Sequence, residues 1–202
     1  MQKLHPMLVR RFVSVVAVAL VIATWAVAQE KPQKAALVKI KNFGQMDDRF
    51  FRGAQPKNEA DYKALAQLGI KTVIDLTDDP KEYEKPLVES LGMKYVHIPM
   101  IAKKYPTPEA TEAFLKTVND PNTGKFYLHC AGGRHRTGAM GAVYRYEFYN
   151  WDFDKVYQEM KQYDFYPSWG HGAFKDFVKD YFAKKQANHA NAADAPQKED
   201  KK

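Results

Sequence analysis

The chain has 202 residues, of which 45% are hydrophobic and 13% aromatic, so it can form the core of one globular domain and is not disordered throughout. Its net charge of +7 lies mostly at the two ends, since residues 29–182 contribute only +2. This distribution argues against a nucleic-acid-binding domain, and the single cysteine excludes an internal disulfide and a cysteine-rich zinc site.

The N-terminal 28 residues have the pattern of an export signal. The first eleven carry three basic side chains and no acidic one, and the apolar run 12–26 is followed by the small-residue site Ala26-Val27-Ala28. We expect cleavage before Gln29 and a periplasmic or secreted protein without stable membrane association. The alternative is a membrane anchor through 12–28, although the run of about 15–17 residues is shorter than a comfortable bilayer span.

After a linker at 29–36, residues 37–182 form one predicted domain in which strand and helix patterns alternate. Strands are predicted at 71–76, 95–98 and 126–129. Helices are predicted at 58–68, 81–91, from Thr107-Pro108 onward with a buried stripe of Phe114, Leu115 and Val118, and at 137–149, 154–163 and 172–182. This order indicates an α/β domain with a mostly parallel sheet covered by helices.

Residues 183–202 contain no large apolar side chain and are predicted to be a disordered tail. The preceding Trp169-Gly170-His171-Gly172 stretch is predicted to form a tight turn that leads into the last helix. We expect the protein to be a monomer.

The segment from His129 to Gly138, His-Cys-Ala-Gly-Gly-Arg-His-Arg-Thr-Gly, joins a predicted strand to a predicted helix. In α/β proteins this is where ligands bind. Its glycines allow the backbone N–H groups to turn inward, and such a nest at a helix N-terminus binds a tetrahedral anion. Cys130 would lie at the base of the nest, where the amides and Arg136 favour the thiolate. The segment therefore predicts a nucleophilic thiolate beneath a bound phosphoryl group.

We predict specific roles for several residues of this loop. The predicted phosphate-binding residues are Ala131, Gly132, Gly133, Arg134, His135 and Arg136. The planar guanidinium of Arg136 can hold two phosphate oxygens at once. Thr137 would stabilise the sulfur as the leaving group when water attacks a cysteinyl-phosphate intermediate, and His129 would orient the loop. This chemistry requires no metal and no cofactor.

The Cys-x5-Arg pattern resembles the signature of the protein tyrosine and dual-specificity phosphatase superfamily. The stretch Arg52-Gly53-Ala54-Gln55-Pro56 looks like a motif that lies beside the active-site loop in atypical dual-specificity phosphatases. The Gly-Arg-His-Arg-Thr-Gly form of the loop is similar to that of the plant and fungal branch. The resemblance covers about residues 40–165 and implies a central sheet of four or five strands with helices on both faces. It also implies hydrolysis of phosphomonoesters, and some members of the branch are inositol pyrophosphate phosphatases.

The general acid is the open question. Family members supply an aspartate from the loop that corresponds to 99–108 here, and that loop contains no carboxylate. The candidates are His135, Asp78, Asp79 and Glu109. A further alternative is that no protein acid is needed, because a phosphate leaving group departs with less help.

The substrate class also stays open. Arg134, His135, Lys103 and Lys104 would favour a polyanionic substrate, although the two lysines equally suit a solvated loop. We therefore keep three hypotheses: an exported cysteine-dependent phosphatase acting on phosphorylated protein, an inositol polyphosphate or pyrophosphate phosphatase, and a catalytically silent phosphate-binding module.

Overall fold

The structure is a computed structural model that describes residues 38–193. The expected export signal (1–28) and linker (29–36) lie outside the described residues, as does the end of the expected tail from 194 onward. None of the helices in the described part combines the length and apolar character needed to cross a bilayer.

The sheet is the frame on which the loop after Cys130 is built. Its strands are β1 (Gly44–Gln45), β2 (Phe50–Ala54), β3 (Thr72–Asp75), β4 (Lys94–His97) and β5 (Phe126–Cys130), in the order β1-β2-β5-β3-β4. All pairs are parallel except β1 with β2. The register pairs Ala54 with Cys130 and Asp75 with His129, so the carboxyl ends of β2, β3 and β5 meet at one edge.

The three predicted strands are confirmed, with ends that differ by at most one residue. The strands β1 and β2 were not predicted. The sequence of β2, Phe-Phe-Arg-Gly-Ala, has an arginine and a glycine at its centre, which are poor strand residues. All five residues of β2 are nevertheless buried, because the strand lies between β1 and β5 in the sheet.

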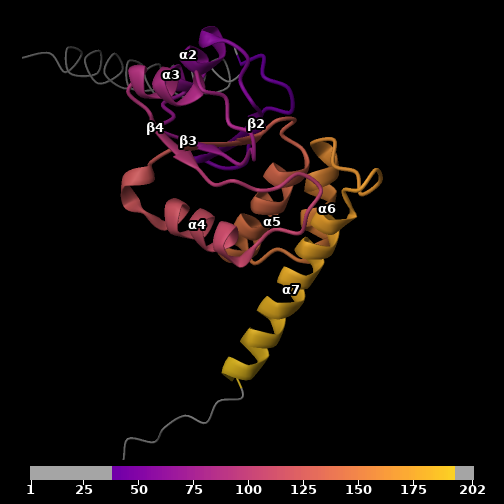
Figure 1. The fold of residues 1–202 in the computed structure, drawn as a ribbon. Coiled ribbons are helices and arrows are strands. Elements are labelled where there is room, and N and C mark those ends of the chain that lie inside the picture. The colour runs from indigo at the N-terminus through magenta and orange to yellow at the C-terminus, as the bar shows by residue number, and fades with distance from the viewer. Residues whose placement is uncertain (1–37, 194–202) are drawn as a thin grey trace, which may run out of the picture. The chain divides into compact units, whose positions relative to one another are not determined.

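Each predicted helix is present. The helices are α2 (Glu59–Gln67), α3 (Glu84–Ser90), α4 (Pro108–Asn119), α5 (His135–Tyr149), α6 (Phe153–Gln162) and α7 (Gly172–Ala193), with a short 3-10 turn at Pro121–Thr123. Asn58 and Thr107 cap α2 and α4 through their side-chain oxygens, and Gly69 follows α2 with a positive φ of 82°. Figure 1 shows α2 and α3 on one side of the strands and α4 to α7 on the other. The predicted α/β architecture, a mostly parallel sheet with helices on both faces, is confirmed.

The helix α5 is the central element of the larger helical layer. Its residues from His135 to Tyr146 are all buried, because α4, α6, α7 and β5 contact it. The buried Arg145 side chain binds Glu159 of α6 with N–O distances from 2.6 to 3.1 Å and donates to the Met46 carbonyl at 2.9 Å. A helix enclosed in this way gives the loop at its N-terminus a rigid support.

The boundary predicted for the tail is wrong, because α7 continues past Phe182 to Ala193. The prediction relied on the absence of apolar side chains, whereas an alanine-rich segment extends a helix that has already begun. Lys185 also ties the extension to α5 through an ion pair of 3.0 Å with Glu147.

The core between α4 and the sheet predicts that two substitutions within α4 have different effects on the free energy of unfolding. Phe114 is fully buried, whereas Lys116 on the same helix is exposed. We expect Phe114→Ala to lower the free energy of unfolding by about 3–5 kcal/mol, because it removes buried apolar volume. Lys116→Ala should change it by less than about 0.5 kcal/mol. Urea denaturation of both variants measures the difference, and similar midpoints would contradict this packing.

Candidate active site

The predicted anion-binding loop connects β5 to α5 and borders a pocket of about 160 Å³. The loop residues that line the pocket are Cys130, Ala131, Gly132, Arg134, His135 and Arg136. The other lining residues are Ala102, Lys103, Tyr166, His171 and Phe174. The structure therefore brings the predicted nucleophile and guanidinium together in one pocket. The loop 99–108, called the lid loop below, and the start of α7 also contribute to its lining.

The shape of the loop requires glycine at position 133. Gly133 has a φ of +65°, and a Cβ there would collide with the backbone of Gly53 and Ala54. The buried Arg52 donates to the Gly133 carbonyl at 2.7 Å, and Asn42 donates to the Gly132 carbonyl at 2.8 Å. The stretch from Arg52 to Pro56 thus lies beside the loop, as expected. Asn42 is a supporting residue that no role was predicted for.

The surroundings of Cys130 favour its thiolate. Burial by itself raises the pKa of the thiol, but the hydroxyl of Thr137, the charge of Arg136 and the N–H groups of Thr137 and Arg134 lower the pKa below its usual value. The Thr137 hydroxyl is buried, has no other hydrogen-bond partner among the described residues, and lies near enough to the sulfur to lower the pKa of the thiol. This arrangement favours the thiolate, which is the nucleophilic form of the side chain.

Hydrogen bonds fix one edge of the Arg136 guanidinium. Its Nη1 lies 2.6 Å from Asp78 Oδ1, 2.9 Å from the Met100 carbonyl and 3.4 Å from the Leu76 carbonyl. Within residues 38–193, no protein group hydrogen-bonds its Nε and Nη2 atoms. The remaining edge of the guanidinium is therefore available to bind two oxygens of a phosphoryl group.

The carboxylates considered as general acids do not line the pocket. The N–H of Ala102 and the guanidinium of Arg136 lower the pKa of Asp78, which makes Asp78 a partner of Arg136 rather than a proton donor. Asp79 is exposed and pairs with Lys81 at 2.8 Å. Glu109 lies exposed in the first turn of α4, where backbone and Thr107 contacts lower its pKa.

His135 lines the pocket, but its environment opposes protonation. Burial lowers the pKa of His135 to about 4, and the nearby His171, Arg134 and Arg136 contribute to that shift. Its Nε2 lies 3.1 Å from the carbonyl of Tyr166, and a carbonyl can only accept a hydrogen bond. The neutral ring therefore donates from Nε2 and contributes to the shape of the pocket wall.

His129 lies beneath the loop between two buried carboxylates. Its Nε2 is 2.8 Å from Glu84 Oε1 and its Nδ1 is 3.8 Å from Asp75 Oδ1. Burial by itself lowers the pKa of His129, but these two carboxylates raise the pKa above its ordinary value. Glu84 also accepts from Gln55 Nε2 at 2.6 Å, and the N–H of Gln55 donates to the Cys130 carbonyl at 2.9 Å. The cluster thus links α3 to the backbone of the nucleophile.

Asp75, Glu84 and His129 are the group of side chains in the described residues whose donor atoms lie close enough to hold a metal ion. The two carboxylates, however, face the two different nitrogens of one ring. A single ion binds only one nitrogen of an imidazole, so it would have to displace one of these pairs. The arrangement fits a protonated imidazole between two carboxylates better than a metal site. Glu84 is a supporting residue that the sequence analysis missed.

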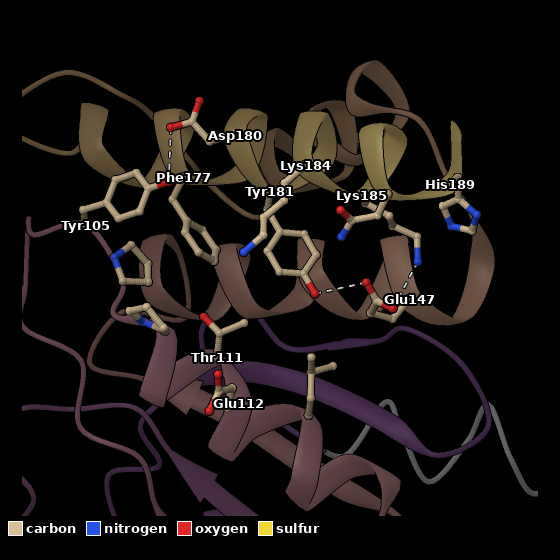
Figure 2. Close-up of a pocket in the computed structure, with 14 residues that line it drawn as sticks. Tyr105, Thr111, Glu112, Glu147, Phe177, Asp180, Tyr181, Lys184, Lys185 and His189 are labelled. Atoms are coloured by element: carbon tan, nitrogen blue, oxygen red, sulfur yellow. Dashed lines mark hydrogen bonds and ion pairs between the residues drawn. The ribbon is translucent and has the colours of Figure 1, made fainter. Parts of the chain in front are cut away.

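A larger hollow of about 640 Å³ lies between α4 and α7 (Figure 2). Tyr105 from the lid loop stands at one end, donates to Asp180 at 3.1 Å and packs edge-on against Phe177. None of the predicted catalytic or phosphate-binding residues lines this groove. Lys103 lines the pocket at Cys130, whereas Lys104 and Tyr105 do not.

The buried pair beneath the loop predicts a specific dependence of stability on pH. Because the folded-state pKa of His129 is raised, the stabilisation from the pair is fully present below the unfolded pKa of about 6.5 and is lost as the pH rises through the folded pKa. The contribution of Glu84 to stability depends on pH in the opposite direction. Because the pKa of Glu84 is lowered in the folded state, its contribution is present above about pH 4.5 and is lost as the pH falls further.

We expect Glu84→Gln to cost about 3–5 kcal/mol near pH 6, because it leaves His129 without its closest buried partner. The loss of stability above pH 6.5 should be weaker in this variant than in the wild type. Urea unfolding across pH 5–9 measures both effects, with the exposed Glu89→Gln in the same helix as the control. Identical pH slopes for wild type and Glu84→Gln would contradict the pair.

Comparisons with known proteins identify relatives of this chain. A family model described as "DSP-PTPase phosphatase fused to NAD+ Kinase" matches residues 9–171. The chain is 26% identical over 134 residues to the putative tyrosine-protein phosphatase OCA1 of Mycosarcoma maydis, a match that covers 63% of this chain and 82% of OCA1. It is 25% identical over 136 residues to the inositol diphosphatase SIW14 of Saccharomyces cerevisiae, over 62% of this chain but 46% of SIW14.

Solved structures show the same fold. The catalytic core of the PP-IP phosphatase SIW14 from S. cerevisiae superposes with a TM-score of 0.63 at 18% identity, over 78% of this chain and 95% of that one. P. aeruginosa TpbA superposes with a TM-score of 0.59 at 23% identity, over 73% and 92%. The predicted resemblance to the atypical dual-specificity phosphatases is thereby confirmed. Because the family model spans well over half of its length, this chain belongs to the DSP-PTPase phosphatases, which are phosphoric monoester hydrolases of the tyrosine and dual-specificity type.

Proposed function

We propose that the protein hydrolyses phosphomonoesters with Cys130 as the nucleophile and a cysteinyl-phosphate as the intermediate. The observation that carries this proposal is the buried thiol at the centre of the loop, with its pKa lowered by Thr137, Arg136 and the loop amides although burial opposes it. The substrate's phosphoryl group would occupy the pocket with its oxygens on the loop amides and on the remaining edge of Arg136.

The reaction has two steps. In the first, the sulfur forms a bond to phosphorus while the bond from phosphorus to the leaving-group oxygen breaks, and that oxygen takes up a proton. In the second, water attacks phosphorus and the Cys130 thiolate departs, stabilised by the Thr137 hydroxyl. Arg136 stays in place during both steps because Asp78 and two carbonyls hold its Nη1.

Two substrate classes have support. The pocket is lined by Lys103, Arg134 and Arg136 and by no carboxylate, which favours a substrate with several phosphates. The relatives SIW14 and DSP2 are inositol diphosphatases. A phosphotyrosine substrate has support from the TpbA structure, which was solved in complex with pTyr. We favour a small polyanionic phosphoester and keep phosphorylated protein as the second candidate.

Replacing Cys130 by Ser tests the nucleophile. The variant should lose turnover by several orders of magnitude, because a serine hydroxyl has no comparable ionised form at neutral pH, yet it should still bind phosphate or vanadate. Phosphate release should be followed from p-nitrophenyl phosphate, a phosphotyrosyl peptide and inositol pyrophosphate, in reductant and without added metal.

Arg136→Lys is the companion variant. It should lower both turnover and affinity, because a lysine cannot hold two oxygens in a fixed plane. Turnover by Cys130→Ser at the wild-type rate would refute the nucleophile. Anion binding without release from any substrate in the wild type would identify a silent phosphate-binding module.

We also propose that residues 1–28 direct export to the periplasm or the exterior. The support is the sequence pattern alone: a basic start, an apolar run and a small-residue site before Gln29. N-terminal sequencing of the protein from its native host should begin at Gln29. A protein that starts at Met1 and sediments with membranes would instead support an anchor through 12–28.

A further inference from the structure

The pocket at Cys130 contains a histidine that the sequence analysis assigned only to a turn. His171 immediately precedes α7 and lines the same pocket as Cys130 and Arg136. The turn before it has two successive residues with positive φ, Trp169 at 58° and Gly170 at 86°. The N–H of His171 closes this turn on the carbonyl of Ser168 at 3.2 Å. The turn places the imidazole at the pocket.

The ring of His171 is held in one orientation. It stacks on the ring of His135 with a centroid separation of 3.5 Å and an angle of 3° between the planes, and its edge meets Tyr166. Its Nδ1 is buried and has no hydrogen-bond partner among the described residues. The Nε2 atom is therefore the nitrogen that is accessible to a molecule in the pocket.

The first step of the reaction needs a proton donor, and the general-acid candidates named from the sequence are not placed to supply one. Asp78 is paired with Arg136, Asp79 and Glu109 do not line the pocket, and the Nε2–H of His135 is directed at the Tyr166 carbonyl. His171 is the remaining imidazole of the pocket lining.

We infer that His171 is the general acid of this phosphatase, an inference that rests on the proposed function. As the bond from Cys130 sulfur to phosphorus forms, Nε2 donates its proton to the departing oxygen. In the second step the neutral Nε2 takes a proton from the attacking water, which restores the acid and releases inorganic phosphate. Protons and bonds balance over the cycle, and no further reactant is needed.

The charges around His171 explain how it acquires its proton. Burial lowers the pKa of His171, and Lys103, Arg134 and Arg136 lower it further. The rings of His135, Tyr166 and Phe174 also contact the ring of His171. A phosphoryl dianion bound among the same three cations offsets their field and favours the imidazolium. The acid thus becomes charged when the substrate is present.

The test compares His171→Gln with the wild type on phosphate esters whose leaving groups range from p-nitrophenol to an alkyl alcohol. A poor leaving group depends on the acid and a good one does not. We therefore expect kcat/KM to fall by about 10²-fold or more on the alkyl ester and far less on p-nitrophenyl phosphate. We expect kcat of the wild type on the alkyl ester to decline at high pH, and this decline should be absent in His171→Gln.

The matched control is His189→Gln, an exposed histidine of the same helix, which should behave as the wild type. Inhibition by inorganic phosphate, measured at a pH high enough to keep His171 neutral in the wild type, shows whether the pocket keeps its shape, and an unchanged inhibition constant in His171→Gln is expected there. His135→Gln and Tyr166→Phe complete the set, because these two residues also line the pocket and carry an N–H or O–H group.

An equal loss on all esters in His171→Gln would overturn the inference, as would a leaving-group-dependent loss in His135→Gln or Tyr166→Phe instead. These outcomes are separate from a failure of the proposed function. If Cys130→Ser is inactive and His171→Gln shows a uniform loss, Cys130 remains the nucleophile but His171 is not the general acid. If Cys130→Ser retains full turnover, Cys130 is not the nucleophile, and the proposed function is rejected independently of the result for His171.

Discussion

The hydrogen bond from the buried Arg52 to the carbonyl of Gly133 fixes the curve of the loop on which the site depends. Arg52 is almost wholly buried in β2, and burial lowers its pKa to about 10, so a cation has been placed where hydration cannot stabilise it. Gly133 allows the loop to approach β2 because it carries no Cβ. With the loop in this shape, the N–H groups of Arg134 and Thr137 point at the Cys130 sulfur. Besides the Thr137 hydroxyl and the Arg136 charge, the backbone geometry set by the neighbouring strand thus contributes to the lowered pKa of the thiol.

The carboxylates near the site support it from behind. Asp78 orients Arg136, and Glu84 and Asp75 hold His129 beneath the loop. The side chains of the His129 cluster are fully buried, so their charges interact strongly and have little freedom. Asp78 is more exposed and holds Arg136 through a short contact of 2.6 Å. The same arrangement leaves the pocket itself without a carboxylate. A site built in this way attracts anions, and it must take its proton from a group other than an acid of the lid loop.

The cations line the pocket and the carboxylates lie outside it. This separation of charge affects both which substrate binds and how the proton donor is protonated. A pocket lined by cations binds a phosphorylated group strongly, and the same cations keep an imidazole neutral until a dianion arrives. If the leaving group is itself a phosphate, it departs with little help from an acid. Activity on pyrophosphates and activity on alkyl esters would then place different demands on His171, while both use Cys130 and Arg136.

The sequence by itself determined the α/β class, the positions of Cys130 and Arg136 on a strand-to-helix loop, and the family, because these depend on local patterns and on a motif of fixed spacing. Only the tertiary structure decided what surrounds them. The strand β2 was missed because its pairing with β5, which is distant in sequence, buries it. The helix α7 extends into the expected tail because its first part is already packed against the domain and the helix continues from there. Asp78 became the partner of Arg136, and His171 reached the pocket from 41 residues beyond Cys130. Contacts between segments so far apart depend on how the helices pack on the sheet, which no local pattern encodes.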